Sequence, residues 1–223
     1  MRKLLILLLI SLAGFQNLEA QHGTWRIVAT KDEIPERNEC GLAACNGKLY
    51  LVGGDTGEPM AVESYDPTTK MWTKLATAPL VMHHFQAVAL NDKIYILDAF
   101  SEGGFPNQEP MSNPYIYKTK TNTWSKGTQI EPERRRGGAG AAVYNGKLYL
   151  VAGIQHGHSS GTTNMFDEYD PASNTWKTLP NAPHIRDHCA AAVIKDKLYV
   201  LGGSNTSYHE PDNFMAFFSK TVL

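Results

Sequence analysis

Short runs of apolar residues recur along this chain, and pairs of runs are separated by two-residue turns. Residues 139–144 are rich in Ala and Val, Asn145-Gly146 follows, and the side chains of residues 147–152 alternate beyond it. Asn-Gly supplies the positive φ angles that a two-residue hairpin requires. The pattern therefore predicts antiparallel β-hairpins.

The hairpin signal belongs to an internal repeat. A phrase ending in Tyr occurs four times, at Tyr50, Tyr95, Tyr149 and Tyr199, which are 45, 54 and 50 residues apart. A second series consists of Trp25, Trp72, Trp124 and Trp176, and the last three each follow a further Tyr by seven residues, namely Tyr65, Tyr117 and Tyr169. Two interleaved series with one period indicate a structural repeat. Four antiparallel strands in each unit of about 50 residues are typical of a propeller blade.

Paired glycines add a further element to the repeat. Gly53-Gly54 and Gly202-Gly203 follow the second strand of the first and last units. With these glycines, the Tyr and the Trp in register, the chain resembles the Kelch repeat family. The resemblance implies an all-β fold, a Kelch-type β-propeller, in a group that includes binding scaffolds, a copper-radical galactose oxidase and periplasmic sialic-acid epimerases. Two units depart from the pattern: Ala152-Gly153 keeps one glycine and Asp98-Ala99 keeps none, so the backbone of the second blade is expected to differ there.

The repeats divide the chain into four blade-like units, at approximately residues 37–80, 82–132, 136–183 and 186–223. Trp25 has the phase of an outer strand, so residues 21–36 are expected to complete another blade. The resemblance implies six or seven blades. The chain is therefore expected to be a truncated piece of such a ring, with a compact four-bladed ring as the alternative.

The first twenty residues have the pattern of a secretory signal peptide. Arg2 and Lys3 precede an apolar stretch from Leu4 to Ile10 that is too short for a permanent membrane span. Cleavage is expected between Ala20 and Gln21, which leaves residues 21–223 as the propeller domain, secreted or periplasmic, with no membrane span. An uncleaved N-terminal anchor is the alternative.

Charge and cysteine content exclude several function classes. The 223 residues include 21 basic and 22 acidic side chains, and this balance gives no reason to expect a nucleic-acid partner. Three cysteines are too few for a disulfide scaffold and match no zinc spacing. His156 and His158 have a spacing that could serve a metal, but their loop sets no geometry, so neither a metal nor a cofactor is predicted.

The length of the repeat varies mainly between the second and third strands. The separations from second-strand Tyr to fourth-strand Trp are 22, 29 and 27 residues, whereas the final seven are constant. Antiparallel alternation puts these loops on the same face as the crossovers between blades, and variable loops on a rigid scaffold commonly carry binding.

Positions counted back from each second-strand Tyr identify candidate residues on that face. Thirteen residues before it stand Arg37, Met82, Arg136 and Arg186, and eleven before it stand Glu39, His84, Gly138 and His188. The resemblance implies that the first strand is innermost, so these positions should ring the mouth of a central channel. The candidate ligand-binding residues are Arg37, Glu39, His84, Arg136, Arg186, Asp187 and His188, with a loop rim of Asp55, His156, His158, Ser204 and His209.

Such a funnel suits an anionic sugar, an acidic peptide or a metal, although the arginines could instead bond to backbone carbonyls or carboxylates and brace the ring. The leading hypothesis is an exported binding module for a glycan or a protein. The alternative is a carbohydrate-active enzyme, either an epimerase or mutarotase of an acidic sugar or a galactose-oxidase-like enzyme. No catalytic residue is assigned, and no motif identifies the tyrosine and cysteine set of a copper-radical site.

Overall fold

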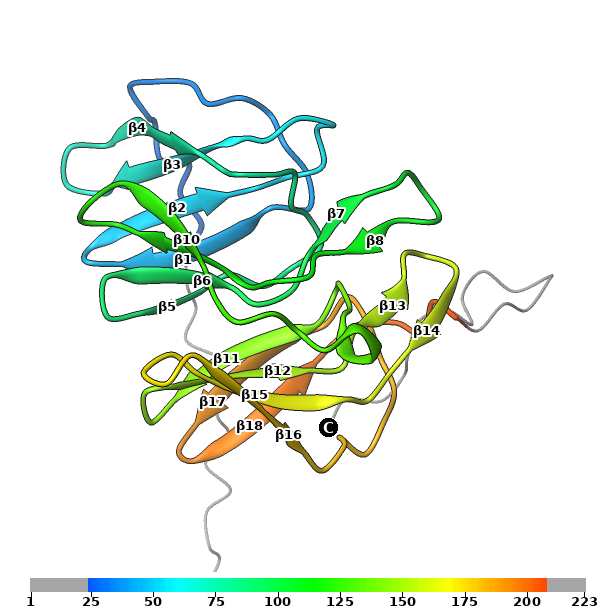
Figure 1. Cartoon of the computed structure of the whole chain (residues 1–223). Coiled ribbons are helices and arrows are strands. Elements are labelled where there is room, and N and C mark those ends of the chain that lie inside the picture. The colour runs from blue at the N-terminus through cyan, green and yellow to red at the C-terminus, as the bar shows by residue number, and fades with distance from the viewer. Residues whose placement is uncertain (1–23, 208–223) are drawn as a thin grey trace, which may run out of the picture.

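The computed structural model describes residues 24–207, and they form an all-β structure, as predicted (Figure 1). Three antiparallel sheets have four strands each, and a fourth sheet has two strands among the described residues. Blade 1 consists of β1 (Gly41–Cys45), β2 (Lys48–Val52), β3 (Ala61–Asp66) and β4 (Met71–Thr77). Blade 2 consists of β5 (Val88–Leu90), β6 (Lys93–Ile96), β9 (Tyr115–Lys118) and β10 (Thr123–Lys126).

Blade 3 repeats the same order of strands. It consists of β11 (Gly140–Tyr144), β12 (Lys147–Val151), β15 (Phe166–Asp170) and β16 (Thr175–Leu179), and blade 4 contributes β17 (Ala190–Ile194) and β18 (Lys197–Leu201). One 3-10 turn, η1 (Pro132–Arg134), precedes blade 3. Two small hairpins project from the same end of the molecule in Figure 1: β7 (Phe100–Glu102) with β8 (Glu109–Pro110), and β13 (Ile154–His156) with β14 (Ser160–Thr162).

The tight turns of the four inner hairpins form as the sequence predicts. Both central residues of each turn have positive φ, namely Asn46-Gly47, Asn91-Asp92, Asn145-Gly146 and Lys195-Asp196. This is the geometry of a two-residue turn whose twist matches that of the strands it joins. The departure predicted for blade 2 is also present: Gly53, Ala152 and Gly202 have φ between 65° and 67°, whereas Asp98 at the equivalent position is not in the left-handed region.

Aromatic residues of the repeat pack within and between blades. Each Tyr of the third strand faces the Trp seven residues later across the last two strands, with ring centroids 5.1, 5.2 and 4.9 Å apart in blades 1, 2 and 3. Between blades, Tyr50 lies 6.2 Å from Tyr117 and Tyr95 lies 6.5 Å from Tyr169. Tilted aromatic pairs of this kind add to the stabilisation from buried area.

The inner strands are β1, β5, β11 and β17, and β1 contacts β5, β5 contacts β11, and β11 contacts β17. Gln86, just before β5, joins three of these inner strands through its side chain. Its Oε1 accepts from the backbone N–H groups of Ala141 (3.0 Å) and Ala191 (2.8 Å), and its Nε2 donates to the carbonyl of Ala191 (2.9 Å). One half-buried amide thereby links blades 2, 3 and 4.

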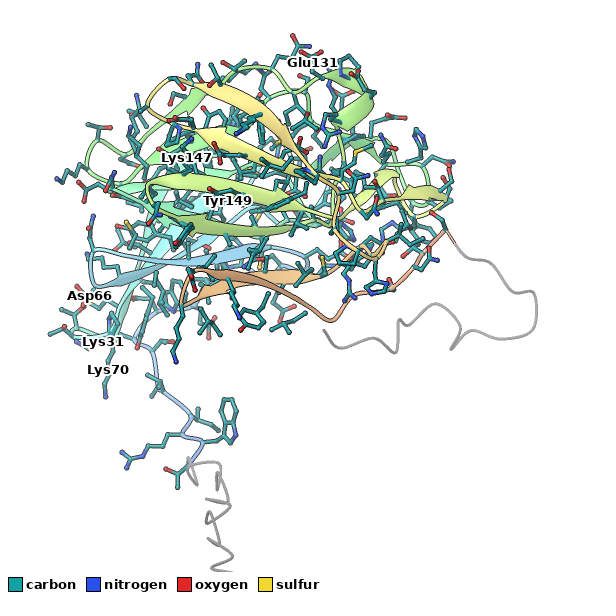
Figure 2. The ribbon with its side chains drawn as sticks, turned by 90° about the horizontal axis from the view of Figure 1, so that it is seen from below. Lys31, Asp66, Lys70, Glu131, Lys147 and Tyr149 are labelled. Atoms are coloured by element: carbon teal, nitrogen blue, oxygen red, sulfur yellow. The ribbon has the colours of Figure 1, made fainter. Side chains whose placement is uncertain are left out.

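Residues 24–36 form no strand, so the outer strand predicted for residues 21–36 is absent from its described part. Trp25 is fully exposed, and the segment contacts blade 1 through the Lys31 N–H, which donates to the carbonyl of Lys70 in the turn between β3 and β4 (Figure 2). A strand requires a paired neighbour. The blade that this segment was expected to complete has only β17 and β18 among the described residues.

The sides of blades 1 and 4 expose apolar side chains that blades 2 and 3 do not. Leu42 on β1 is 55% exposed, and Ile194, Tyr199 and Leu201 of blade 4 are 57%, 37% and 44% exposed. In a propeller, a neighbouring blade covers such a face. This arrangement agrees with the interpretation of the chain as a partial ring.

We expect these faces to make the isolated chain self-associate, because contiguous exposed apolar surface promotes association. Sedimentation velocity should show a mass that rises with concentration. Leu42→Glu and Leu201→Glu should each reduce that rise without abolishing a cooperative thermal transition. A chain that stays monomeric at all concentrations would contradict the expectation.

Candidate functional site: a histidine cluster at the channel mouth

Four residues with left-handed backbone lie at the mouth of the channel, and they are called the mouth ring. Glu39, His84, Gly138 and His188 have φ values of 53°, 56°, 63° and 51°. The N–H of His84 donates to the carbonyl of Glu39 (3.0 Å), and the N–H of Gly138 donates to that of His84 (2.7 Å). These are the residues that the sequence register predicts as equivalent. Together with the first residues of the inner strands they line a cavity of about 390 Å³.

Three histidine rings meet at this mouth. The ring centroids of His84 and His188 lie 5.0 Å apart, those of His84 and His158 4.8 Å apart, and those of His158 and His188 4.9 Å apart. One ring nitrogen of each histidine lies within 4.8 Å of those of the other two. The cluster combines two residues of the mouth ring with one residue of a rim loop.

His158 reaches the cluster because its hairpin docks on blade 2. The N–H of His158 donates to the carbonyl of Pro106 (2.7 Å), and its ring Nδ1 lies 3.1 Å from Oε1 of the buried Gln108. In the mouth ring, the position in blade 3 is Gly138, so no side chain of that blade's inner strand stands beside the rings of His84 and His188. The loop of blade 3 supplies a histidine where its inner strand has none.

Asp187 anchors His188. Its side chain is fully buried, and its Oδ1 accepts from His188 Nδ1 (2.6 Å), Ser204 Oγ (2.9 Å) and Thr206 Oγ1 (2.6 Å). Its Oδ2 accepts from Thr162 Oγ1 (2.6 Å) and the Thr206 N–H (3.0 Å). Burial alone would raise the pKa of Asp187, but these hydrogen bonds outweigh burial and lower the pKa to about 2. Asp187 is therefore an ionised carboxylate that holds one imidazole.

Burial disfavours the charged forms of His83, His84 and His158. Burial, reinforced by the proximity of His188, His83 and His158, lowers the pKa of His84 to about 3. Burial likewise lowers the pKa values of His83 and His158. Glu39 lies beside His84, with its Oε1 2.8 Å from His84 Nε2, and burial together with the nearby Asp55 raises its pKa.

The prediction that the three arginines line the channel mouth is wrong, because their side chains are buried inside their own blades. Arg136 and Arg186 are 1% exposed, and the side chain of Arg37 is 2% exposed. Each donates to the carbonyl of an equivalent residue in its own blade, three residues after the second-strand Tyr: Gly53, Ala152 or Gly202. Arg37 also pairs with Glu63 and Arg136 with Asp167 (2.8 Å), so these side chains brace their blades.

The predicted rim residues fall into different places. His158 and Ser204 join the buried network, whereas Asp55 and His156 are exposed at the rim. His209 lies outside the described residues. His83 and Gln108 were missed as site residues; His83 is adjacent to a ring position, but no pattern in the sequence indicates Gln108. Glu63 and Asp167 were also missed, although both stand two residues before the third-strand Tyr of a blade that carries an arginine.

Comparison with solved structures agrees with this architecture. The structure titled "Structure of YjhT" superposes with a TM-score of 0.61 at 20% sequence identity, covering 75% of this chain and 59% of that one. This similarity concerns the fold alone.

Curated relatives carry the same repeat. The chain is 25% identical over 178 residues to Kelch-like protein terF of Aspergillus terreus, covering 75% of this chain and 39% of that protein. It is 26% identical over 205 residues to N-acetylneuraminate epimerase of Pasteurella multocida, with coverage of 77% and 54%. It is 28% identical over 189 residues to human Kelch repeat and BTB domain-containing protein 8, with coverage of 81% and 29%.

The chain thus spans 29% to 54% of the length of these relatives. Its repeats, its four-stranded blades and its relatives all agree with a Kelch-type propeller. Residues 14–223 match the family described as Attractin/LZTR1 beta-propeller, and the chain belongs to that family.

Proposed function

We propose that this chain is a protein-interaction module that binds its partner on the face formed by the channel mouth and its rim loops. The observation that carries the proposal is that the two small hairpins β7–β8 and β13–β14 project from the same end of the molecule (Figure 1) and are joined there by the bond from the His158 N–H to the Pro106 carbonyl. Loops held on a rigid scaffold are a common form of recognition surface.

An exposed aromatic residue marks this face for protein binding. Phe105 lies between β7 and β8 and is 78% exposed, and its ring centroid is 5.2 Å from that of His158. Exposed aromatic residues that become buried on association supply much of the energy of protein interfaces. The burial of all three arginines inside their blades removes the clamp that an anionic sugar would require, and this favours a protein ligand.

Selection of peptides from a display library on the immobilised full chain tests the proposal. We expect the selected peptides to bind Phe105→Ala at least about tenfold more weakly, as for an interface hot spot. Lys120→Ala, in the turn between β9 and β10, is the matched control and should bind them normally. Peptides that bind Phe105→Ala as tightly as the unaltered chain would contradict the proposal, and a glycan array in parallel would reveal a sugar ligand instead.

A carbohydrate-active enzyme is the second candidate, favoured by the similarity to a protein named N-acetylneuraminate epimerase. Incubation of the chain with N-acetylneuraminate, followed by NMR of the sugar, tests it. Turnover in proportion to enzyme concentration would support this candidate, and its absence would exclude that reaction.

We further propose that the protein is exported, since Arg2, Lys3 and the apolar stretch after them form the pattern of a signal peptide. These residues lie outside the described structure. Within residues 24–207, no helix is long and apolar enough to cross a membrane. The mass of exported material should correspond to a chain that begins at or near Gln21, and retention of Met1 would contradict the proposal.

A further inference from the structure

We propose that His84, His158 and His188 form a binding site for a divalent transition metal ion at the channel mouth, with Zn²⁺ as the best match. The three rings come from blades 2, 3 and 4, and imidazole nitrogen is a ligand that zinc and its neighbours in the first transition row prefer. The metal site lies on the same face as the proposed protein-binding surface, but it does not depend on the existence of a protein partner.

The spacing of the rings suits one shared ion. Three imidazoles that bind an ion tetrahedrally through nitrogens about 2.0 Å away have ring centroids roughly 5 Å apart. The observed separations of 4.8 to 5.0 Å form a nearly equilateral triangle of that size. The ligand nitrogens lie within 4.8 Å of one another, so small ring rotations bring them to a common centre.

Neighbouring groups orient two of the rings as metal ligands are oriented. His188 Nδ1 donates to the carboxylate of Asp187, and His158 Nδ1 lies 3.1 Å from the amide oxygen of Gln108. Because both neighbours offer an oxygen acceptor, each Nδ1 carries the proton and each Nε2 keeps a lone pair. A carboxylate or carbonyl that holds the second nitrogen is the usual partner of a metal-bound histidine.

His84 supplies a nitrogen that nothing else in the described residues satisfies. Its Nε2 is buried and has no hydrogen-bond partner, although Glu39 Oε1 lies 2.8 Å away outside hydrogen-bond geometry. An unsatisfied buried nitrogen costs free energy, and coordination of a cation would relieve that cost. Glu39 groups with His83 and His84 and not with His158 and His188, so water would be the fourth ligand of the ion.

The charges around the cluster favour a cation. The carboxylates of Glu39 and Asp187 each lie beside a ring of the cluster, 2.8 Å from His84 Nε2 and 2.6 Å from His188 Nδ1, whereas no lysine or arginine is among the described residues that line the mouth cavity.

Titration of the full chain, first stripped with EDTA, tests the proposal with Zn²⁺ and with Co²⁺ as a spectroscopic probe. We expect one equivalent of metal to bind, the Co²⁺ form to show the visible absorption of a four-coordinate site, and the melting temperature to rise with Zn²⁺. His158→Ala and His188→Gln should each weaken binding at least about 100-fold, while Gln108→Leu, which removes only an orienting group, should weaken it by about 10- to 100-fold.

His184→Ala is the matched control, because His184 is exposed and outside the cluster, and it should leave affinity and stoichiometry unchanged. Circular dichroism and thermal melting in EDTA should show that each variant folds. Loss of binding in a folded His158→Ala variant supports the site. The proposal is overturned if the unaltered chain does not bind metal stoichiometrically. It is also overturned if His158→Ala keeps full affinity. If Glu39→Gln then abolishes binding, the ion lies instead on the neighbouring set of Glu39, His83 and His84.

Discussion

Arg136→Ala is expected to lower the free energy of unfolding by about 3 to 5 kcal/mol, the usual cost of removing one partner from a buried ion pair. Arg136 is 1% exposed and donates to the carbonyls of Ala152 (2.6 Å) and Leu150 (3.1 Å) while pairing with Asp167 (2.8 Å). Removal of the guanidinium takes this donor from both buried carbonyls and leaves Asp167 with Arg134, whose Nε donates to Asp167 Oδ1 (2.6 Å). Urea denaturation followed by tryptophan fluorescence measures the change.

Arg135→Ala is the matched control, since Arg135 is the adjacent residue, is partly exposed and makes a side-chain bond only to the Ile130 carbonyl among the bonds seen in the described residues. Its loss should cost less than about 1 kcal/mol. A cost for Arg136→Ala no larger than that of the control would refute the bracing role.

Blade 2 indicates which apolar residues could replace the buried ion pair of Arg136 and Asp167. At the positions equivalent to Arg136 and Asp167, blade 2 has Met82 and Tyr115, which are 1% and 6% exposed and belong to one apolar cluster. Replacing both members of a buried ion pair by well-packed apolar residues is often neutral. The double variant Arg136→Met/Asp167→Tyr should therefore lose less stability than the sum of its single variants.

The fold could be predicted because its signals are local and repeated. A two-residue turn with positive φ determines the inner hairpin of each blade. A Tyr and a Trp seven residues apart then face each other across the third and fourth strands. The mouth ring could be predicted for the same reason, since Glu39, His84, Gly138 and His188 stand at a constant distance before the hairpin turn. Counting residues therefore placed them correctly.

The direction of the arginines could not be obtained by counting. A position thirteen residues before the Tyr is fixed along the strand, but whether its side chain enters the channel or the blade depends on partners in the third strand. The signal was present as a correlation within the repeat: arginine occurs with Glu63 or Asp167, and Met82 occurs with Tyr115. Only the folded blade shows that these positions meet.

The histidine cluster was only half accessible to sequence reasoning. His84 and His188 follow from register, whereas His158 lies in a loop of variable length whose position is set by docking on Pro106 of another blade. Contacts of this kind depend on tertiary structure and leave no spacing pattern. The sequence consequently predicts no metal, whereas the assembled cluster leads us to propose one.

Asp98→Asn is expected to make the protein more stable at alkaline pH than the unaltered chain. Asp98 stands in blade 2 where the other blades have Gly53, Ala152 and Gly202, the residues whose carbonyls receive the arginines. It is 1% exposed; its Oδ2 accepts from the Ala139 N–H (2.9 Å), and its Oδ1 has no hydrogen-bond partner among the described residues. Burial raises its pKa to about 7, against the opposing effects of the Ala139 N–H and of Arg136.

The direction of the pH effect follows from this raised pKa. The unfolded chain ionises Asp98 near its ordinary value of about 3.9, whereas the folded chain resists ionisation until about pH 7, so the contribution of Asp98 to stability is lost as pH rises through that interval. The buried histidines, whose pKa values are lowered, act in the opposite direction over part of the same range. The difference between the variant and the unaltered chain isolates Asp98 from them.

We expect that difference in the free energy of unfolding to move in favour of Asp98→Asn by about 2 to 3 kcal/mol between pH 5 and pH 8, since each pKa unit corresponds to about 1.4 kcal/mol. Urea denaturation at several pH values in EDTA measures it. Asp92→Asn is the control, because Lys120 holds the pKa of the Asp92 carboxyl below its ordinary value; this group is ionised in both the folded and the unfolded chain above pH 5, so its profile should run parallel to that of the unaltered chain over this interval. Parallel profiles for Asp98→Asn and the unaltered chain would contradict this prediction. They would mean that Asp98 is ionised in the folded protein, because Arg136 compensates the free-energy cost of burying its charge between blades 2 and 3.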